Sequence, residues 1–426
     1  MKINYELLKN HTFVTKLAGF EHSDYIQKNE TKTKVSLDDI PLVQGKNIKN
    51  GIFIEQFDWY INKGISDKLI RSKLTKDCIL VPYVGSNLGE VGIFYHNYDC
   101  HLASNIAKIE LIDDYFDLEY IKYYLQSPIG QKFLFQSKQG SGQPNITMDS
   151  IRNTQIINYS KEYQKKIVKL LKPIDDKIFL NNSINHELEK ISKALYDYWF
   201  LQFDFPNEEG KPYKSSGGKM VWNDELNKEI PEGWEVTNLF NDNLFSIIDV
   251  GLKKFDKKIY LATANIDDGL FTKGNIVNYD NRESRANMQP KPYSVWFAKM
   301  KDSVKHLFIP KNSNWFTDKY ILSTGLYGLQ CNETSFAYVA SYIRNKNFEI
   351  QKNLLAHGST QKAISDDDLK NFKLIVPSID ILEKYAEKTN SIFEMIFSNL
   401  KENEELSSLR DFLLPLLMNG QVVIED

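Results

Sequence analysis

The stretch GSGQPNIT at residues 140–147 recurs 218 residues later as GSTQKAIS at residues 358–365. A four-residue turn can recur by chance, so the surrounding sequence decides whether a larger unit is repeated. The same offset aligns further residues from about residue 47 to residue 202. The aligned pairs include Asn47 with Asn265, Tyr120 with Tyr338, Tyr124 with Tyr342, Asn153 with Asn371, and Asn181 with Asn399. One offset kept over this length indicates a tandem duplication.

Each copy begins with short apolar runs separated by Gly, Asn and Asp, a pattern that predicts β-strands. The runs are residues 78–84, 91–96 and 106–111 in the first copy, and residues 293–300, 305–310 and 324–330 in the second. A helix is expected after the strands of each copy, at residues 118–127 and 336–345. Each copy therefore predicts a globular domain of mixed α/β (α+β) class.

A long helix is expected after each domain. From Lys161 on, apolar residues recur in alternating steps of three and four, which is the period of a coiled-coil seam. The first seam comprises Ile167, Leu171, Ile174, Ile178, Leu188, Ile191, Leu195 and Tyr198, and the second Tyr385, Ile392, Ile396, Leu406, Leu409, Leu413 and Leu416. Packing these stripes on each other predicts an antiparallel coiled coil with pseudo-two-fold symmetry between the copies.

Polar and imino residues interrupt the predicted helices. Asn181 and Asn399 occupy equivalent seam positions. An Asn in a seam costs stability but fixes the helix register, whereas the simpler interpretation is that both side chains face solvent. Pro173 lacks a backbone N–H, so we expect a kink or a new helix start after Lys172.

These patterns divide the chain into six segments. They are a first domain (residues 1–157), a first long helix (158–202), a linker (203–230), a second domain (231–376), a second long helix (377–420) and a tail (421–426). The linker is predicted because the segment is rich in Gly, Pro, Ser and charged residues.

The composition excludes several classes of protein. The net charge of −3 argues against a protein that coats nucleic acid indiscriminately, although local basic patches remain compatible with it. The three cysteines form no CxxC pair and no HExxH stretch occurs, so we expect no metal site and no disulfide framework. The N-terminal sequence lacks the apolar core of a signal peptide and no apolar run reaches membrane-spanning length, which predicts a cytoplasmic protein without membrane contact.

No catalytic residue is predicted. The sequence contains neither an NPPF- or DPPY-type loop for base methylation nor a GxxxxGK[ST] phosphate loop. Asp175, Asp176 and Lys177 resemble a nuclease set, but they lie on the predicted helix, where a solvated charged face is the simpler interpretation.

The predicted architecture suits a partner that repeats along an axis. A helix of roughly 30 residues spans about 45 Å, and B-DNA presents the same face about every 34 Å. Loop residues offer matching chemistry, because Gln and Asn pair with adenine, Arg and Lys with guanine, and Lys and Ser with phosphate. The DNA-binding candidates of the first domain are Gln44, Lys46, Asn47, Lys49, Asn50, Ser86 and Asn87, and those of the second are Arg282, Arg285, Asn287, Gln289, Lys291 and Tyr293.

The repeated Gly-Ser-x-Gln turns add Ser141 and Gln143 in the first copy and Ser359 and Gln361 in the second. Gly140 and Gly358 would allow another molecule to approach the backbone closely. Alternatively, the serines cap the turn and the glutamines bond the local backbone. Every loop named here could also be an ordinary solvated turn.

The chain resembles the specificity (S) subunits of type I restriction–modification enzymes. The resemblance rests on both Gly-Ser-x-Gln turns and on LYDYWF, DFP and IPEGW in this order between residues 195 and 234. It implies two target-recognition domains that read a bipartite sequence in double-stranded DNA. The first domain lacks an IPEGWEV stretch, so its start is expected to be built differently.

The resemblance further implies protein partners, namely methyltransferase (M) subunits and motor-nuclease (R) subunits. S-adenosylmethionine, ATP and Mg²⁺ would bind these partners, and this chain would hold no cofactor. Two alternatives remain: a coiled-coil scaffold that binds proteins only, and a DNA-modifying enzyme with an unrecognised motif.

Overall fold

The computed structural model describes residues 4–49, 51–136, 146–240, 243–358, 361–422 and 424 of the 426-residue chain. The chain forms two compact units: unit 1 comprises Met1–Phe179 and Glu405–Asp426, and unit 2 comprises Leu180–Glu404. Each unit therefore contains one copy of the repeat together with a part of both long helices. In the described ranges, no helix is long and apolar enough to cross a membrane.

The first domain, in unit 1, contains two four-stranded sheets. One is antiparallel throughout, in the order β2 (Thr12–Lys16), β11 (Ile106–Leu111), β8 (Cys78–Pro82) and β9 (Gly92–Phe94). The other has the order β6 (Tyr60–Ile61), β3 (Ile40–Val43), β10 (Cys100–Leu102) and β7 (Lys73–Leu74), with β3 and β10 parallel. Two short pairs join β1 (Tyr5–Leu7) with β12 (Gln155–Ile157) and β4 (Ile48–Lys49) with β5 (Ile52–Phe53).

The second domain, in unit 2, repeats this topology. Its antiparallel sheet has the order β16 (Phe245–Ile247), β25 (Leu326–Cys331), β22 (Ser294–Ala298) and β23 (His306–Ile309). Its other sheet has the order β20 (Asn275–Val277), β17 (Lys258–Leu261), β24 (Tyr320–Ser323) and β21 (Ala286–Met288), with β17 and β24 parallel. The short pairs are β15 (Glu235–Thr237) with β26 (Leu374–Val376) and β18 (Ile266–Asp267) with β19 (Leu270–Phe271). The predicted duplication is confirmed.

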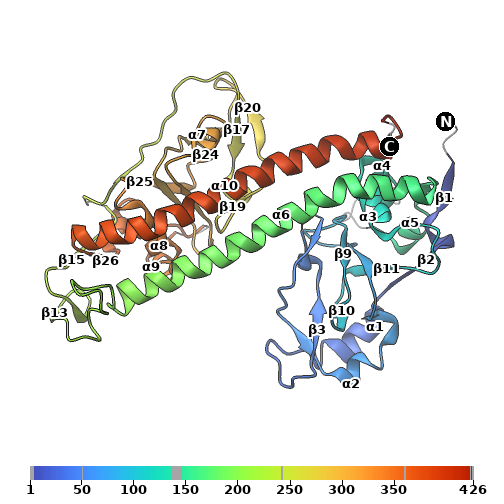
Figure 1. Cartoon of the computed structure of the whole chain (residues 1–426), viewed down its shortest axis with the longest axis horizontal. Helices are drawn as coiled ribbons and strands as arrows, with labels where there is room; N and C mark the ends of the chain where they lie inside the picture. The colour runs from blue at the N-terminus through green and yellow to red at the C-terminus, as the bar shows by residue number, and fades with distance from the viewer. Residues whose placement is uncertain are drawn as a thin grey trace. The chain divides into compact units, whose positions relative to one another are not determined.

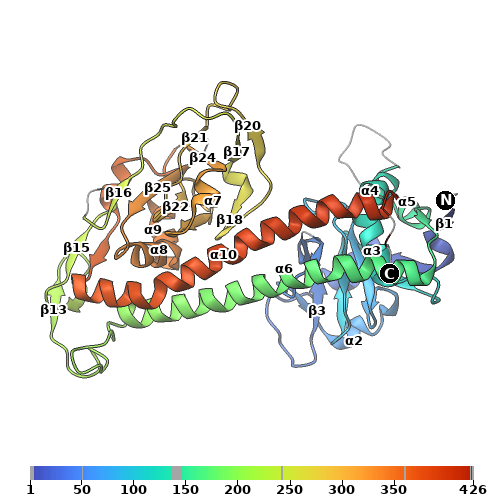
Figure 2. The ribbon, with the colours of Figure 1, turned by 45° about the horizontal axis from the view of Figure 1, so that its top comes forward.

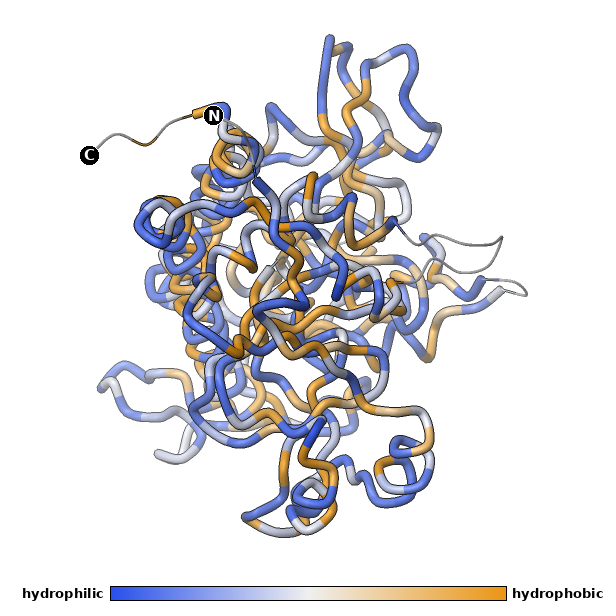
Figure 3. Tube along the Cα trace, turned by 90° about the vertical axis from the view of Figure 1, so that its right-hand side faces the viewer, coloured by the Kyte–Doolittle hydropathy of each residue, from blue (hydrophilic) through white to orange (hydrophobic). Residues whose placement is uncertain are grey.

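Two short helices cover the sheets of each domain. The first domain has α3 (Leu118–Gln126) and α4 (Pro128–Leu134), and the second α8 (Phe336–Arg344) and α9 (Lys346–Leu355). Asp117 caps α3, accepting hydrogen bonds from the backbone N–H groups of Glu119 and Tyr120 at 3.0 and 3.2 Å. The strands and helices expected from the apolar runs are thus present. Figure 3 shows hydrophobic (orange) and hydrophilic (blue) segments alternating along the trace, with blue segments on several outlying loops.

The start of the first domain follows the same plan as that of the second. β1 pairs antiparallel with β12, as β15 pairs with β26, although IPEGWEV precedes only β15. The two starts are therefore alike in this strand pairing. The additional feature of the second copy is the hairpin of β13 (Met220–Asn223) and β14 (Lys228–Pro231), which lies before β15.

The segment at residues 203–230 belongs to unit 2 and contributes to its core. Phe203 and Phe205 are buried. The Phe205 ring stacks on Tyr213 and on Trp234, with centroid distances of 4.6 and 4.9 Å. The Gly-, Pro- and Ser-rich turns of this segment connect buried aromatic residues. The overall composition of the segment does not reveal this packing.

The long helices are α6 (Lys161–Tyr196) and α10 (Ile379–Met418). α6 continues through Pro173, so the expected new helix start after Lys172 is wrong. Proline removes one backbone hydrogen bond, while Leu171 and Ile174 on either side of it are buried and hold this turn of the helix in place.

Within each unit, α6 and α10 run antiparallel (Figures 1 and 2). In unit 2, Asn181 Nδ2 donates to Asn403 Oδ1 at 3.0 Å, and Asn399 Nδ2 donates to Asn185 Oδ1 at 2.8 Å. Residue numbers thus rise on one helix as they fall on the other. Asn181 is fully buried, so its interpretation as a solvent-facing residue is wrong.

The second half of the α6 seam differs from its prediction. Ile191 and Tyr198 are 55% and 38% exposed. The buried positions are instead Asn181, Asn185, Ser192, Tyr196 and Trp199. Similarly, Leu409 of α10 is exposed. The buried residues still recur in steps of three and four, but several of them are polar. A search for apolar residues alone therefore assigns the wrong residues to the buried face of the helix.

Candidate nucleic-acid interface

Equivalent loops meet at one edge of each domain, where β8 and β22 end. In the first domain, Tyr83 N–H donates to the Asn105 carbonyl, and the Tyr83 carbonyl accepts from Ile146 N–H, both at 3.0 Å. In the second domain, Lys299 makes the same two bonds, to Gly325 and from Ile364, also at 3.0 Å. We call this region the loop edge of each domain. Ile146 and Ile364, which follow the two Gly-Ser-x-Gln sequences closely, thus occupy equivalent places in the two domains.

The turn itself is described only in part. Gly140, Ser141, Gln143, Ser359 and also Asn50 lie outside the described residues. Gly358 has a φ of +127°, and a Cβ there would lie 2.6 Å from the Gln361 carbonyl oxygen. A bridge between His357 and Ala363 closes the turn. Glycine is thus required by the turn's own backbone, and approach by another molecule is not needed to explain it, while Gln361 is exposed.

The loop edge of the second domain is rich in cations. The carbonyl of Arg285 accepts from Thr324 N–H at 2.9 Å, next to Gly325, and Lys301 N–H donates to the Lys362 carbonyl at 2.9 Å. The cationic residues gathered here are Arg285, Lys299, Lys301 and Lys362. Within the described ranges, none of these four side chains forms an ion pair with a carboxylate. The loop edge therefore combines unpaired positive charge with exposed hydrogen-bonding groups.

Lys299 occupies the most enclosed position of this cationic set. Its ammonium lies 4.1 Å from the centroid of the Tyr327 ring. Burial lowers the pKa of Lys299, and the carboxylate of Asp366, which accepts from the Tyr327 hydroxyl, partly offsets this effect. The aromatic face holds the cation in place without neutralising its charge.

The loop edge of the first domain brings two predicted segments together. Asn87 Nδ2 donates to the carbonyls of Gly45 and Ile48 at 3.1 and 2.8 Å, which ties the loop of Ser86 to the turn of Gln44 and Lys46. Lys16 lies over the Tyr83 ring at 4.6 Å. Ser86 and Lys46 are exposed, and Lys46 pairs with Asp58. Asn87 itself has a structural role because its amide is used inside the domain.

Asn47 also has a structural role. It is 1% exposed; its Oδ1 accepts from Gln44 N–H at 2.8 Å, and its Nδ2 donates to the carbonyls of Ile54 and Gln56. Asn265 makes the equivalent bonds in the second domain, from Ala262 N–H and to the Lys273 carbonyl, both at 3.0 Å. Its placement corrects the expectation that Asn47 contacts DNA. Lys49 lies half-buried on β4 next to this turn.

Lys291 and Tyr293 lie away from the loop edge. Both precede β22, whereas Lys299 follows it, and five residues of strand span about 16 Å. Tyr293 packs on Phe336, and its carbonyl accepts from Cys331 N–H at 2.8 Å. These contacts make Tyr293 part of the domain's packing.

The remaining candidates of the second domain bond within it. The guanidinium of Arg282 stacks 4.2 Å from the centroid of Tyr279 and lies 3.4 Å from Asn287 Oδ1. Gln289 donates to the Thr317 carbonyl at 3.1 Å. Of the sequence-predicted residues of this domain that the structure describes, only Arg285 and Gln361 are thus both exposed and placed at the loop edge.

Four cations at the loop edges were missed from the sequence: Lys16, Lys299, Lys301 and Lys362. Three of them carried a usable signal. Lys299 lies at the end of a predicted strand, Lys301 directly follows that strand, and Lys362 directly follows the Gly-Ser-x-Gln turn. Lys16 reaches the loop edge from β2, which only the sheet order reveals.

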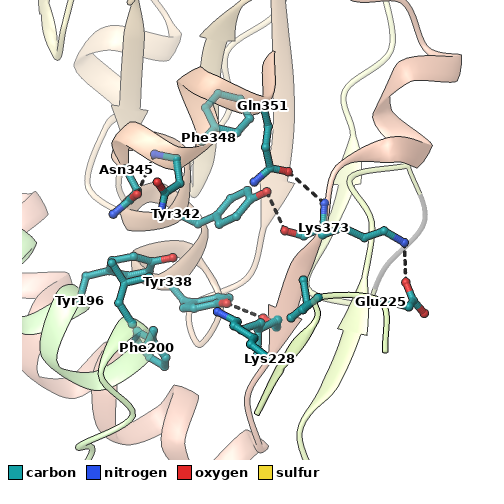
Figure 4. Close-up of a pocket in the computed structure, with 14 residues that line it drawn as sticks. Tyr196, Phe200, Glu225, Lys228, Tyr338, Tyr342, Asn345, Phe348, Gln351 and Lys373 are labelled. Carbon is teal, nitrogen blue, oxygen red and sulfur yellow. Dashed lines mark hydrogen bonds and ion pairs between the residues drawn. The ribbon is translucent and has the colours of Figure 1, made fainter. Parts of the chain in front are cut away.

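A separate cavity of about 280 Å³ lies in unit 2, between α8, α9, β26 and the end of α6 (Figure 4). Aromatic and polar residues line it, and several of the polar groups bond one another. The Tyr342 hydroxyl donates to the Lys373 carbonyl at 3.2 Å, Lys373 N–H donates to Gln351 Oε1 at 3.3 Å, and the Lys373 ammonium pairs with Glu225. This cavity therefore offers few free groups to a nucleic acid.

The carboxylate of Asp175 is used structurally. It is buried in unit 1 and bonds Arg410 Nη1 of α10 at 2.9 Å, as well as Lys122 and the Tyr123 hydroxyl of α3. Burial alone would raise the pKa of Asp175, but the two cations outweigh it and hold the pKa below its ordinary value. Among the described residues, no group of three or more His, Cys, Asp or Glu side chains could hold a metal ion.

Comparisons with known proteins agree with this architecture. Residues 24–190 match the family model described as "Type I restriction modification DNA specificity domain". The chain is 28% identical over 407 residues to the type I restriction enzyme MjaIX specificity subunit of Methanocaldococcus jannaschii, which covers 91% of this chain and 88% of that protein. It is 26% identical over 347 residues to the HindI specificity subunit of Haemophilus influenzae, covering 68% and 74%.

A solved structure shares the fold. The crystal structure of the S subunit of a type I restriction–modification system from M. genitalium superimposes with a TM-score of 0.53 at 16% identity, covering 98% of this chain and 96% of that one. The duplicated domains and the paired long helices agree with the sequence relatives. Residues 24–190 match the model of a type I restriction modification DNA specificity domain, and over most of its length the chain is similar to specificity subunits of type I restriction enzymes.

Proposed function

We propose that this chain reads a two-part DNA sequence, one half with the loop edge of each domain. The observation that carries the proposal is that the two loop edges share a backbone but differ in side chains. Asn47 and Asn265 hold equivalent turns. By contrast, Tyr83 of the first domain corresponds to Lys299 of the second. Two domains that recognise different DNA sequences need this combination of the same backbone and different side chains.

The side chains suggest how the second half-site is held. Lys301 and Lys362 would contact phosphates, and Arg285 would pair with a guanine or a phosphate. Gln361 would pair with an adenine. In the first domain, Gln44, Lys46 and Ser86 would serve these purposes.

The protein partners would supply the chemistry. Methyltransferase subunits would bind this chain and hold S-adenosylmethionine, and motor-nuclease subunits would hold ATP and Mg²⁺. The net charge of this chain is −3, whereas tight DNA binding by a protein alone depends on positive charge that neutralises phosphates. We therefore expect tight DNA binding only in the complex with the methyltransferase subunits.

Mapping adenine methylation tests this function. The chain is co-expressed with its methyltransferase subunits, and methylated adenines are located across a genome by single-molecule sequencing. We expect a split motif with two specified halves around a fixed gap. A continuous motif, or none, would favour the scaffold that binds proteins only. Methylation by the isolated chain would favour the unrecognised enzyme.

A further inference from the structure

A buried charged cluster anchors the β18–β19 hairpin of the second domain. Its centre is His306 on β23, whose side chain is 1% exposed. His306 Nδ1 lies 2.9 Å from Asp268 Oδ1 in the hairpin turn, and Nε2 lies 3.0 Å from Glu349 Oε1 on α9. The His306 carbonyl also accepts from Gly269 N–H at 3.0 Å. One residue thus joins the hairpin to α9.

Both ring nitrogens of His306 face carboxylate oxygens, which only accept hydrogen bonds. A neutral imidazole has one N–H and can satisfy only one of them, whereas the imidazolium satisfies both. Burial by itself would lower the pKa of His306, but Asp268 and Glu349 outweigh it and raise the pKa above its ordinary value. The geometry therefore fits a charged His306 at neutral pH.

Other charges surround the cluster. Lys352 of α9 pairs with Glu349 at 2.7 Å and donates to the Ser303 carbonyl. Arg344 of α8 pairs with Glu189 of α6 at 3.2 Å and lies near Asp268 and Gly269. Lys305 donates to the Ile266 carbonyl. Glu349 thus pairs with a second cation, Lys352, whereas the cation that bonds Asp268 directly is His306.

The first domain holds the equivalent hairpin with fewer charges. Gly51, the counterpart of Gly269, donates its N–H to Glu90 Oε2 at 3.0 Å. Gln126 stands where the second domain has Arg344 and donates to the Val91 carbonyl at 2.7 Å. Gln131 stands in place of Glu349 and donates to the Gly89 carbonyl at 2.9 Å. This hairpin has no histidine anchor among these contacts, so it is an internal control.

The hairpin is connected to the loop edge. β18 follows the turn at Thr263–Asn265 directly, and Thr272 N–H after β19 donates to the Asn265 carbonyl at 2.8 Å. Thr263 lies against Gly325, where an added Cβ would be 2.6 Å from Thr263 Oγ1. A displacement of the hairpin would therefore reach Gly325, which is bonded to Lys299.

We propose that His306 is a positioning residue that, as an imidazolium, fastens the β18–β19 hairpin to α9 and makes the order of the second domain, but not the first, depend on pH. Its effect on DNA reading rests on the proposed function; its effect on the hairpin does not. Because the folded-state pKa of His306 is raised, its stabilisation is complete below the ordinary pKa of about 6.5 and is lost as the pH rises through the folded value.

Hydrogen exchange of the full chain tests this directly. Amide exchange in residues 266–271 and 48–53 is measured from about pH 6 to about pH 9 and corrected for intrinsic pH dependence. We expect the second-domain hairpin to lose about tenfold in protection across this range, which corresponds to one hydrogen bond to a charged group. Protection of residues 48–53 is expected to stay constant. Equal responses in the two hairpins, or none, would overturn the proposal.

Two variants separate the anchor from general damage. His306→Gln keeps a hydrogen-bonding side chain but cannot become charged, so residues 266–271 should show the high-pH exchange rate at every pH. Asp268→Asn alters a half-exposed carboxylate and should remove most of the pH response while preserving the fold. A pH response unchanged in Asp268→Asn would count against the anchor even if His306→Gln failed to fold.

A methylation readout then connects the anchor to function. In the complex with methyltransferase subunits, His306→Gln should relax the half-motif read by the second domain several-fold and leave the other half unchanged. Relaxation of both halves would contradict the inference. Absence of a split motif in the unmodified complex would instead refute the proposed function, and the exchange experiment would still decide the role of His306.

Discussion

At the residue scale, Asn47 and Asn265 show why the sequence misassigned some contacts. An Asn in a Lys-rich loop suits both base recognition and turn stabilisation, and only the structure shows that its amide is used inside the domain. The repeat itself held the needed information. Residues that are identical in the two copies, such as Asn47 and Asn265, stabilise the shared backbone. Recognition of two different half-sites requires residues that differ between the copies.

Replacing Asn47 by Ala removes three internal hydrogen bonds and leaves partly buried backbone groups unpaired. We expect a loss of about 1–3 kcal/mol in the free energy of unfolding, measured by denaturant titration. Lys46→Ala in the same turn is the control, and it should change stability by less than about 0.5 kcal/mol. Equal effects of the two substitutions would contradict the structural role of Asn47.

Lys291 and Lys362 are exposed lysines of the second domain that lie near opposite ends of β22. In the complex, Lys362→Ala should weaken DNA binding for all sequences and reduce the slope of log affinity against log salt by about 1, because one phosphate contact is lost. Lys291→Ala should leave this slope unchanged. Affinity measurements at several salt concentrations compare the two, and a matching decrease for Lys291→Ala would remove the loop edge from the interface.

At the scale of elements, the strands and the short helices could be predicted because their apolar runs are continuous and strongly buried. The phase of the α6 seam could not be predicted beyond Ile178, since its next core positions are Asn181, Asn185 and Ser192. The packing of residues 203–230 was not predicted, because the buried aromatic residues of this segment are scattered among turn-forming residues.

The Asn185–Asn399 pair in unit 2 should be energetically coupled. Asn399→Leu leaves Asn185 Oδ1 without its donor, which costs about 1–3 kcal/mol. The double variant Asn185→Leu/Asn399→Leu removes both partners, so it should be less destabilised than the sum of the single variants by about 1 kcal/mol. Equilibrium unfolding of the unmodified chain, the two single variants and the double variant gives this coupling energy. Glu187→Ala, at an exposed position of the same helix, is the control. If the effects of the single variants simply added up, the two asparagines would not be coupled.

The ion pairs of Asp175 predict a pH-dependent stability in unit 1. Asp175→Asn leaves Lys122 and Arg410 without their shared carboxylate and should cost about 3–5 kcal/mol at neutral pH. Since the folded-state pKa of Asp175 is lowered, its contribution is present above the ordinary pKa and is lost as the pH falls below about 4. Stability curves of the two proteins should therefore converge in acid, and a constant difference would contradict this assignment.

At the scale of the whole molecule, the duplication was the most reliable prediction because it depends on many residues in a single register. The choice of DNA-contacting residues depended on single loops, and the structure retains only part of that set at the loop edges. The missing information was the order of the strands, which places Lys16 beside Tyr83.

Exchange of one domain should change one half of the recognised sequence. Replacing residues 231–376 with the corresponding domain of a relative that reads another sequence should alter one half of the methylation motif and preserve the other half. Single-molecule sequencing of the modified genome provides the measurement. A change in both halves would show that the domains do not read independently.

The amides between α6 and α10 also bear on how the chain folds. If the two helices met one heptad out of register, Asn181 would face Ile396 in place of Asn403, and Asn185 would face Ile392 in place of Asn399. Each such encounter buries amides without partners, at a cost comparable to much of a domain's net stability. Misaligned helix pairs should therefore dissociate quickly, and the long helices avoid kinetic traps that a purely apolar seam would allow.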